Sequence, residues 1–269
     1  MKLGLCLSGG GARGAYQIGA LMALKEAGIY DKVKYISGTS IGAANAALIA
    51  SNELEVVRDI WFNVPKETLH STENFFKRIF KERTKIMVNG LYEINELDKI
   101  LTNNLDYKKI KEKKVFVTLS SGGPEDSGIL ELLKKSFRHY IKHDKQVVYS
   151  PLWEQDIENI NKQIIASCSI PVIFPPMTIE GKHYYDGGVY DNVPIKPLVE
   201  AGCDTIIVIH LEHMLLYSYN AKYKDVTFHA IKPKHSLGSR LRFEENQSKI
   251  RYEMGYEDTK SFLEEHKIL

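Results

Sequence analysis

A pentapeptide near the N-terminus, Gly38-Thr39-Ser40-Ile41-Gly42, has the residues of a catalytic turn. Its GxSxG spacing is that of a nucleophile elbow, in which a serine stands on a sharp turn between a strand and a helix. The stretch 33–37 before it predicts a strand, and the small residues of 41–53 predict a helix. The flanking glycines would let neighbouring backbones approach, so that Ser40 presents its hydroxyl to a substrate. A serine that only caps the helix fits the same residues, because serine is a favoured N-cap.

A run of glycines follows the first predicted strand at 2–8. The sequence Gly9-Gly10-Gly11-Ala12-Arg13-Gly14 formally fits GxGxxG, the fingerprint of a nucleotide-binding oxidoreductase. That interpretation needs an acidic residue about 20 residues further on, whereas the second strand ends in Tyr35-Ile36-Ser37 and leads into the pentapeptide. Converging backbone N–H groups at a helix N-terminus can instead form an oxyanion hole. The residues expected to form it are Gly9, Gly10, Gly11 and Arg13, with Gly14 as motif support.

The oxyanion hole and the serine would meet if both loops follow neighbouring parallel strands. Open α/β sheets place their sites at the carboxyl ends of such strands. In that arrangement the amides of Gly10 and Gly11 face the hydroxyl of Ser40, and Arg13 adds a cation in the first helical turn. A nucleophile beside an oxyanion hole is half of an acyl-transfer site.

A serine hydroxyl needs a base, and the nine histidines offer no obvious one. In the order serine, acid, histidine of the α/β-hydrolases, the base would lie late in the chain, which leaves four candidates. His210 belongs to an apolar stretch, where a structural histidine fits better. Once His210 is set aside, His235 is the best of the remaining three. The four candidates are His210, His213, His229 and His235.

A carboxylate offers a stronger candidate for the base. Asp186 ends an aromatic stretch and is followed by Gly187 and Gly188, which permit tight turning and close contact with other backbone. An Asp-Gly pair alone is a hairpin signal, but a plain turn explains neither the second glycine nor the Asp191-Asn192 pair that follows. The functional interpretation makes Asp186 the base for Ser40, as a dyad without histidine.

The elements that must position these groups alternate between strands and helices. Two strand, turn and helix units open the chain, which indicates parallel strands covered by helices. The expected fold is α/β, a three-layer α/β/α sandwich with a mainly parallel central sheet. Further strands are expected at 115–119, 146–150, 205–211 and 226–231, and further helices around 94–105, at 159–168 and from 243 onward.

Composition and charge limit the class of protein. The chain has 269 residues, 43% hydrophobic and 26% charged, and 36 basic against 34 acidic residues leave a net charge of +2. This composition indicates a globular protein and gives no reason to expect a nucleic-acid partner. Three cysteines without a CxxC pair, and no secretory or membrane-spanning stretch, favour the cytoplasm. A single domain is expected over 1–269, with core motifs at 3–211 and an extension at 212–269.

Four blocks in the correct order resemble the patatin-like phospholipase family, in the form of its small bacterial members. This resemblance implies a serine lipid acyl hydrolase with a patatin-like fold. Ser40 would be its nucleophile, Asp186 its base and the 9–11 loop its oxyanion hole, and neither metal nor cofactor would be needed. The family often has an acidic residue before the glycines, where this chain has Ser8. The blocks are GGGARG (9–14), GTSIG (38–42), ASCSIPVIFPP (166–176) and YDGGVYDNVPI (185–195).

The segment 67–89 could bring such an enzyme to its substrate, an acyl lipid. Phenylalanines alternate there with lysines and arginines, as in a helix that lies on an anionic membrane or covers a cleft. The segment would then be a mobile lid, and the protein peripheral at a membrane. A peripheral core helix with a solvated basic face is the alternative interpretation of the same residues. Two other functions stay open, a catalytically silent binding or regulatory protein on the same fold, and acyl transfer to an alcohol in place of water.

Overall fold

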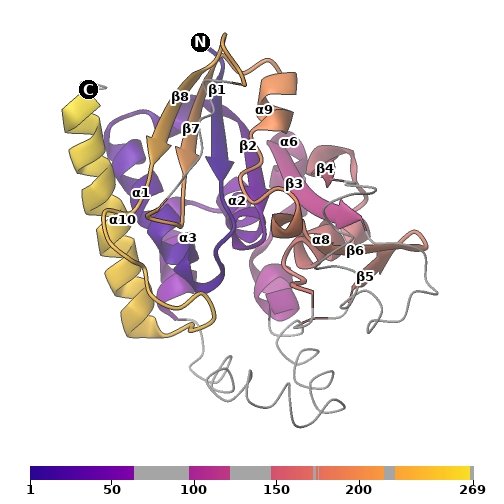
Figure 1. Cartoon of the computed structure of the whole chain (residues 1–269). Coiled ribbons are helices and arrows are strands. Elements are labelled where there is room, and N and C mark those ends of the chain that lie inside the picture. The colour runs from indigo at the N-terminus through magenta and orange to yellow at the C-terminus, as the bar shows by residue number, and fades with distance from the viewer. Residues whose placement is uncertain (64–96, 122–146, 172–173, 175, 215–221, 267–269) are drawn as a thin grey trace.

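A computed structural model describes residues 1–63, 97–121, 147–171, 174, 176–214 and 222–266. Its centre is an eight-stranded sheet in the order β5-β6-β3-β2-β1-β7-β8, with β4 paired to β3 (Figure 1). The neighbouring strands β3, β2, β1, β7 and β8 are mutually parallel. At the other edge of the sheet, β4 and β6 pair antiparallel with β3, and β5 pairs antiparallel with β6. The strands are β1 Leu3–Leu7, β2 Val33–Thr39, β3 Lys114–Ser121, β4 Val147–Pro151, β5 Met177–Ile179, β6 Lys182–Asp186, β7 Thr205–Ile209 and β8 Thr227–Ile231.

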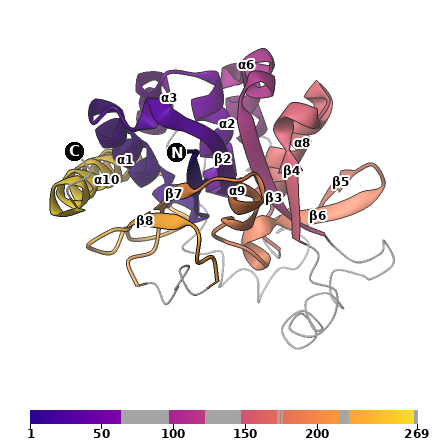
Figure 2. The same ribbon diagram turned by 90° about the horizontal axis from the view of Figure 1, so that it is seen from above.

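Helices cover the two faces of the sheet unequally, which confirms the expected α/β/α layers. Figure 2 shows α1, α2, α3 and α8 on one face and α9 on the other. The side chains of β1 alternate accordingly, since Leu5 packs into the larger core and Cys6 into the smaller one. The α-helices are α1 Ala15–Glu26, α2 Ile41–Ser51, α3 Leu54–Phe62, α6 Tyr107–Glu112, α8 Ile157–Ser167, α9 Lys196–Glu200 and α10 Glu245–His266, and residues 97–104 are also helical.

The predicted strands and helices that fall in the described ranges are confirmed, with small changes at their ends. The apolar run expected as a strand at 205–211 leaves the sheet after Ile209. The larger difference is the antiparallel hairpin of β5 and β6, which no alternation of apolar and polar residues predicts. Its turn uses left-handed backbone at Glu180 and Gly181, with φ of 50° and 73°.

Strand β3 brings distant segments together because both of its sides are paired. One side pairs with β4 along 116–120. The other side pairs first with β2, where Thr118 lies opposite Thr39, and then with β6, where Leu119 lies opposite Asp186. The end of β6 therefore meets the end of β2 at adjacent positions of one template strand.

The last helix, α10, packs tightly along α1 through two glycines. A Cβ on Gly19 would collide with the carbonyl oxygen of Tyr252, and one on Gly255 with that of Tyr16. The two backbones are thus in direct contact, which fixes α10 against the helix that follows the glycine run. In the described part of the chain, no helix combines the length and apolar character needed to span a membrane.

Candidate active site

Ser40 stands on the strained turn that its sequence motif predicts. It lies between the end of β2 and the start of α2, with φ 55° and ψ −127°, which is left-handed backbone for a residue with a side chain. The flanking glycines are required by contact, because a Cβ on Gly38 would collide with the carbonyl of Gly42, and one on Gly42 with that of Leu7. The end of strand β1 therefore packs directly against the turn that carries Ser40.

Asp186 meets Ser40 directly. Asp186 is 5% exposed, and its carboxylate accepts a hydrogen bond from the Gly188 N–H at 2.7 Å. The Ser40 hydroxyl lies close enough to this carboxylate to favour its ionised form. Its own N–H donates to the Ser169 carbonyl at 2.9 Å. A Cβ on Gly187 would collide with the Thr118 carbonyl, so this glycine lets the chain turn against β3. The contact follows from the pairing of β3 with both β2 and β6.

Burial sets the acidity of this carboxyl group. Removal from water raises the pKa of Asp186 from 3.8 to about 6, and hydrogen bonds from Ser40 and Gly188 oppose that rise. A base with a pKa near neutrality accepts a proton more readily than an exposed aspartate does, and it is still ionised at pH 7. The site thus holds a hydroxyl and an ionised acceptor in direct contact.

The glycine loop lies beside Ser40, with its amides in different roles. The N–H of Gly9 donates to the Asn192 carbonyl at 3.1 Å, and the Asn192 amide returns a bond to the Gly9 carbonyl at 3.3 Å. Within the described residues, no acceptor is found for the N–H groups of Gly10 and Gly11. Because β1 and β2 are parallel neighbours, this loop lies at the same sheet end as Ser40, as the sequence predicts.

Arg13 points to other loops of the molecule. Its guanidinium donates to Glu212 at 2.6 Å and, through Nε, to the Gly238 carbonyl at 2.8 Å. These contacts hold the helical turn Gly11–Gly14 against the C-terminal part of the chain. The positive charge that the sequence places in the first helical turn is therefore paired with a carboxylate.

Ser167 is a site residue that sequence reasoning missed. Its buried hydroxyl accepts from the Ser40 N–H at 2.9 Å and donates to the Thr118 carbonyl at 2.8 Å. It thereby supplies the hydrogen bond that the strained turn leaves open. The only sequence signal was its place within the block at 166–176.

The described histidines take no part in this contact. Desolvation and the bonds from Ser40 and Gly188 account for the pKa of Asp186, and no described histidine lines the cavity beside Ser40. His210 is 1% exposed, and burial lowers its pKa to about 4, which matches the structural role that its apolar surroundings indicate. Likewise, no group of three His, Cys, Asp or Glu side chains in the described ranges is arranged to hold a metal.

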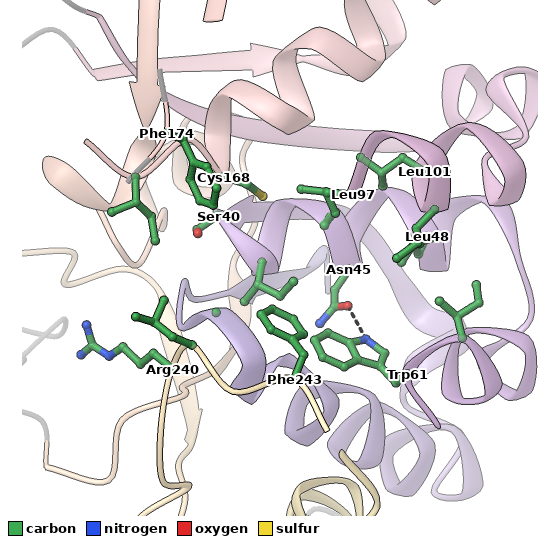
Figure 3. Close-up of a pocket in the computed structure, with 17 residues that line it drawn as sticks. Ser40, Asn45, Leu48, Trp61, Leu97, Leu101, Cys168, Phe174, Arg240 and Phe243 are labelled. Carbon is green, nitrogen blue, oxygen red and sulfur yellow. Dashed lines mark hydrogen bonds between the residues drawn. The ribbon is translucent and has the colours of Figure 1, made fainter. Parts of the chain in front are cut away.

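An apolar cavity of about 140 Å³ opens beside Ser40. One buried water needs only about 10–15 Å³, so this space suits a larger apolar group. Among the polar side chains of its wall is Asn45, whose side-chain carbonyl accepts a hydrogen bond from the Trp61 indole at 2.9 Å (Figure 3). Trp61 in turn stacks on Phe243, with ring centroids 5.9 Å apart. The described residues of the wall include Ile41, Ala44, Leu48, Leu97, Leu101, Cys168, Phe174 and Leu241.

Comparison with known proteins identifies the family. The patatin-like phospholipase family matches residues 5–199, which is more than half of the chain. The chain belongs to this family. The match includes the elbow at Ser40, the glycine loop and Asp186, and membership supports a lipid ester hydrolase. The match ends before β7, β8 and α10. The segment expected as a lid, 67–89, lies outside the described residues.

Individual relatives agree with this membership. Lysophospholipase NTE1 of Cryptococcus neoformans is 27% identical over 213 residues, which cover 77% of this chain and 11% of the relative. The chain thus spans about a tenth of the length of such relatives. An uncharacterised mimivirus protein, R571, is 26% identical over 202 residues, 71% of this chain and 59% of its own.

Solved structures of patatin-like proteins share the fold. VipD from Legionella pneumophila has a TM-score of 0.51 at 16% identity, over 98% of this chain and 67% of its own. ExoU of Pseudomonas aeruginosa, in its complex with SpcU, also has a TM-score of 0.51, at 15% identity over 98% of this chain and 51% of that one. At this identity the likeness concerns the fold alone.

The bond from Ser167 to the elbow yields a test. Ser167→Ala leaves the buried N–H of Ser40 without its acceptor, so the turn should shift, with kcat for ester hydrolysis falling by about tenfold and stability by about 1–3 kcal/mol. Steady-state kinetics and urea unfolding measure both effects. Ser169→Ala is the matched control, because that buried hydroxyl donates only to the Ile165 carbonyl at 2.9 Å. Equal kcat values in the two variants would contradict this role of Ser167.

Proposed function

We propose that this protein hydrolyses carboxylic esters of acyl lipids by a serine and aspartate dyad. The observation that supports it most is the placement of the Ser40 hydroxyl, on a strained turn, beside the buried carboxylate of Asp186, whose ionised form it favours. Family membership and the relatives named lysophospholipase point to the same class of substrate. A catalytically silent protein would not need a serine on strained backbone that lies next to a buried carboxylate and an apolar cavity.

The first half of the reaction forms an acyl-enzyme. The Ser40 oxygen attacks the ester carbonyl carbon while its proton passes to Asp186. The carbonyl oxygen becomes an oxyanion and accepts hydrogen bonds from the N–H groups of Gly10 and Gly11. When the tetrahedral intermediate collapses, the bond to the leaving alcohol breaks, and Asp186 returns the proton to that alcohol.

The second half repeats these steps with water. Asp186 accepts a proton from the attacking water, and the same two amides stabilise the second oxyanion. Collapse breaks the bond between the acyl carbon and Ser40, whose oxygen regains the proton. The free fatty acid then leaves, and the enzyme returns to its starting state.

Electrostatics must supply much of the catalysis. A carboxylate with a pKa of about 6 is a weak base toward an alcohol, even after its burial. Each oxyanion donor is worth about 2.7–4 kcal/mol of the barrier, so two preorganised amides compensate for a large part of that mismatch. The rigid setting of Ser40 between β2 and α2 adds the entropic advantage of a fixed attack geometry.

The cavity beside Ser40 would hold the acyl chain of the substrate. Ile41, Ala44 and Leu48 follow one face of α2 and line it, and Figure 3 shows Ser40 and Leu48 on either side of Asn45. From Ser40 to Leu48 the helix advances about 12 Å. A carbon chain with bonds of about 1.5 Å gains roughly 1.3 Å per carbon, so this wall suits a chain of about nine carbons before Leu48.

Covalent labelling tests the proposal most directly. An alkyl fluorophosphonate should label Ser40, identified by peptide mapping, because it forms a stable phosphonyl ester with an activated serine. Ser40→Ala should lose both labelling and hydrolysis of lysophospholipids. Asp186→Asn should lower kcat by about 10²–10⁴ through loss of the general base. His235→Ala, at an exposed position, is the control and should keep full activity.

Several outcomes would contradict the proposed hydrolysis by the dyad. Label on another serine, or hydrolysis that persists in Ser40→Ala, would place the chemistry elsewhere. Transfer of the acyl group to an added alcohol with no release of fatty acid would make the protein an acyltransferase. A folded protein without labelling or turnover across lipid classes would favour the binding or regulatory alternative.

The pKa of Asp186 predicts the pH dependence. The base must be ionised, so kcat/KM should fall as the pH drops through about 6 and should level off above pH 7. The profile of a soluble ester such as p-nitrophenyl octanoate, measured from pH 4.5 to 8.5, checks this. An acidic limb centred near pH 4 would show that Asp186 is not held in its buried setting.

Chain-length preference tests the cavity. Leu48→Ala should open the far part of the wall and raise kcat/KM for esters two carbons longer than the wild-type optimum by about tenfold, at about 0.8 kcal/mol for each buried methylene. Leu48→Met conserves volume and should keep the original optimum. A series of p-nitrophenyl esters from acetate to palmitate measures the shift. An unchanged optimum in Leu48→Ala would contradict an acyl chain along α2.

A further inference from the structure

The part of the chain after the family match reaches the glycine loop. The family covers residues 5–199, yet Arg240, Leu241 and Phe243 line the cavity beside Ser40. We name residues 237–242 the clamp loop. A Cβ on Gly11 would collide with the carbonyl oxygen of Arg240, so the clamp loop lies directly against the predicted oxyanion hole.

Arg251 of α10 connects these two segments from inside the molecule. Its side chain is 1% exposed, and its guanidinium donates to the carbonyls of Leu237 at 3.0 Å, Arg242 at 3.1 Å and Ser239 at 3.0 Å in the clamp loop. One further bond, at 2.7 Å, goes to the carbonyl of Ala12, the residue that follows Gly10 and Gly11. Four backbone carbonyls are thus bound by one planar group.

The charge of Arg251 persists in this setting although burial opposes it. Burial lowers the pKa of Arg251 to about 10, and the neighbouring Arg13 acts in the same direction. The group therefore stays protonated at neutral pH. Burying this cation costs free energy of desolvation, which charge-assisted hydrogen bonds to fixed backbone carbonyls and the nearby charge of Glu244 offset. A buried charge kept in this way indicates that the backbone segments it binds must keep a fixed geometry.

The glycine loop is tied to the clamp loop in three ways. The Ala12 N–H donates to the Arg240 carbonyl at 2.7 Å, and the Ala12 carbonyl accepts from Arg251 at 2.7 Å. The third tie comes from the next residue, Arg13, whose Nε donates to the Gly238 carbonyl at 2.8 Å. Both sides of Ala12 are therefore fixed, and with them the direction in which the preceding amides point.

We propose that Arg251 is a positioning residue for catalysis, which holds the amides of Gly10 and Gly11 in place by binding Ala12 and the clamp loop together. This inference rests on the proposed function. It extends the catalytic apparatus to α10, beyond the residues that define the family. Loss of the clamp should weaken stabilisation of the oxyanion, which exists only along the reaction, and should leave binding of the ground-state ester nearly unchanged.

Kinetics per titrated site test this role. Arg251→Lys keeps the charge but cannot bind four carbonyls. Hydrolysis of p-nitrophenyl octanoate is measured, and active sites are counted by complete labelling with an alkyl fluorophosphonate. We expect kcat per site to fall about 10–100-fold with KM within twofold, as for a small misplacement of catalytic groups. Leu263→Ala, in the buried part of the same helix, should lower stability without changing kcat per site.

A second variant covers failure of the first to fold. Arg13→Gln cuts the other tie to the clamp loop at a partly exposed side chain, and kcat per site should fall about tenfold. Wild-type kcat per site in Arg251→Lys, or in Arg13→Gln if the first does not fold, would overturn the clamp, and so would a rise in KM at constant kcat. The dyad itself is judged separately, because its failure would appear as hydrolysis or labelling that survives Ser40→Ala.

Discussion

The burial of one carboxylate against one hydroxyl is the constraint around which this site is built. Because the folded state raises the pKa of Asp186 from 3.8 to about 6, it holds a proton that the unfolded chain releases between these values. Stability therefore falls as the pH rises through that window, by roughly 3 kcal/mol once both states are ionised. The rest of the fold must offset this loss of stability. In the proposed function, the same burial brings the pKa of the base closer to neutral pH.

Close approach of backbones is the means by which the carboxylate and the hydroxyl meet. Strand β3 pairs with β2 and then with β6 on the same side, so the segments that lead to Ser40 and Asp186 end at neighbouring positions. Glycines at 38, 42 and 187 remove the Cβ atoms that would hold these backbones apart. Ser167 supplies the hydrogen bond that the strained elbow lacks. Each contact restricts the turn at Ser40, and together they make its unfavourable backbone conformation the stable one.

An apolar wall and a polar interior coexist because the polar groups near the cavity are bonded among themselves. Asn45 donates to Gln17 and to the Gly14 carbonyl and accepts from Trp61, and Gln17 donates to the Ser8 carbonyl beneath the glycine loop. This network leaves hydrocarbon as the main surface beside Ser40. The same chain of bonds joins the cavity wall to the end of β1, so the cavity and the glycine loop share one rigid support.

The sequence by itself determined the local features. The elbow at Ser40, the glycine run, the Asp-Gly-Gly turn after Asp186 and most strands and helices follow from patterns read within a few residues, where backbone preference and periodicity act. Only the tertiary structure decided which amides of the glycine run already have an acceptor: the Gly9 N–H donates to the Asn192 carbonyl. The same holds for Ser167, Arg251 and the antiparallel edge, since their partners are distant in sequence. Hydrogen bonds between distant segments depend on how the sheet is ordered, and no local pattern of residues encodes that order.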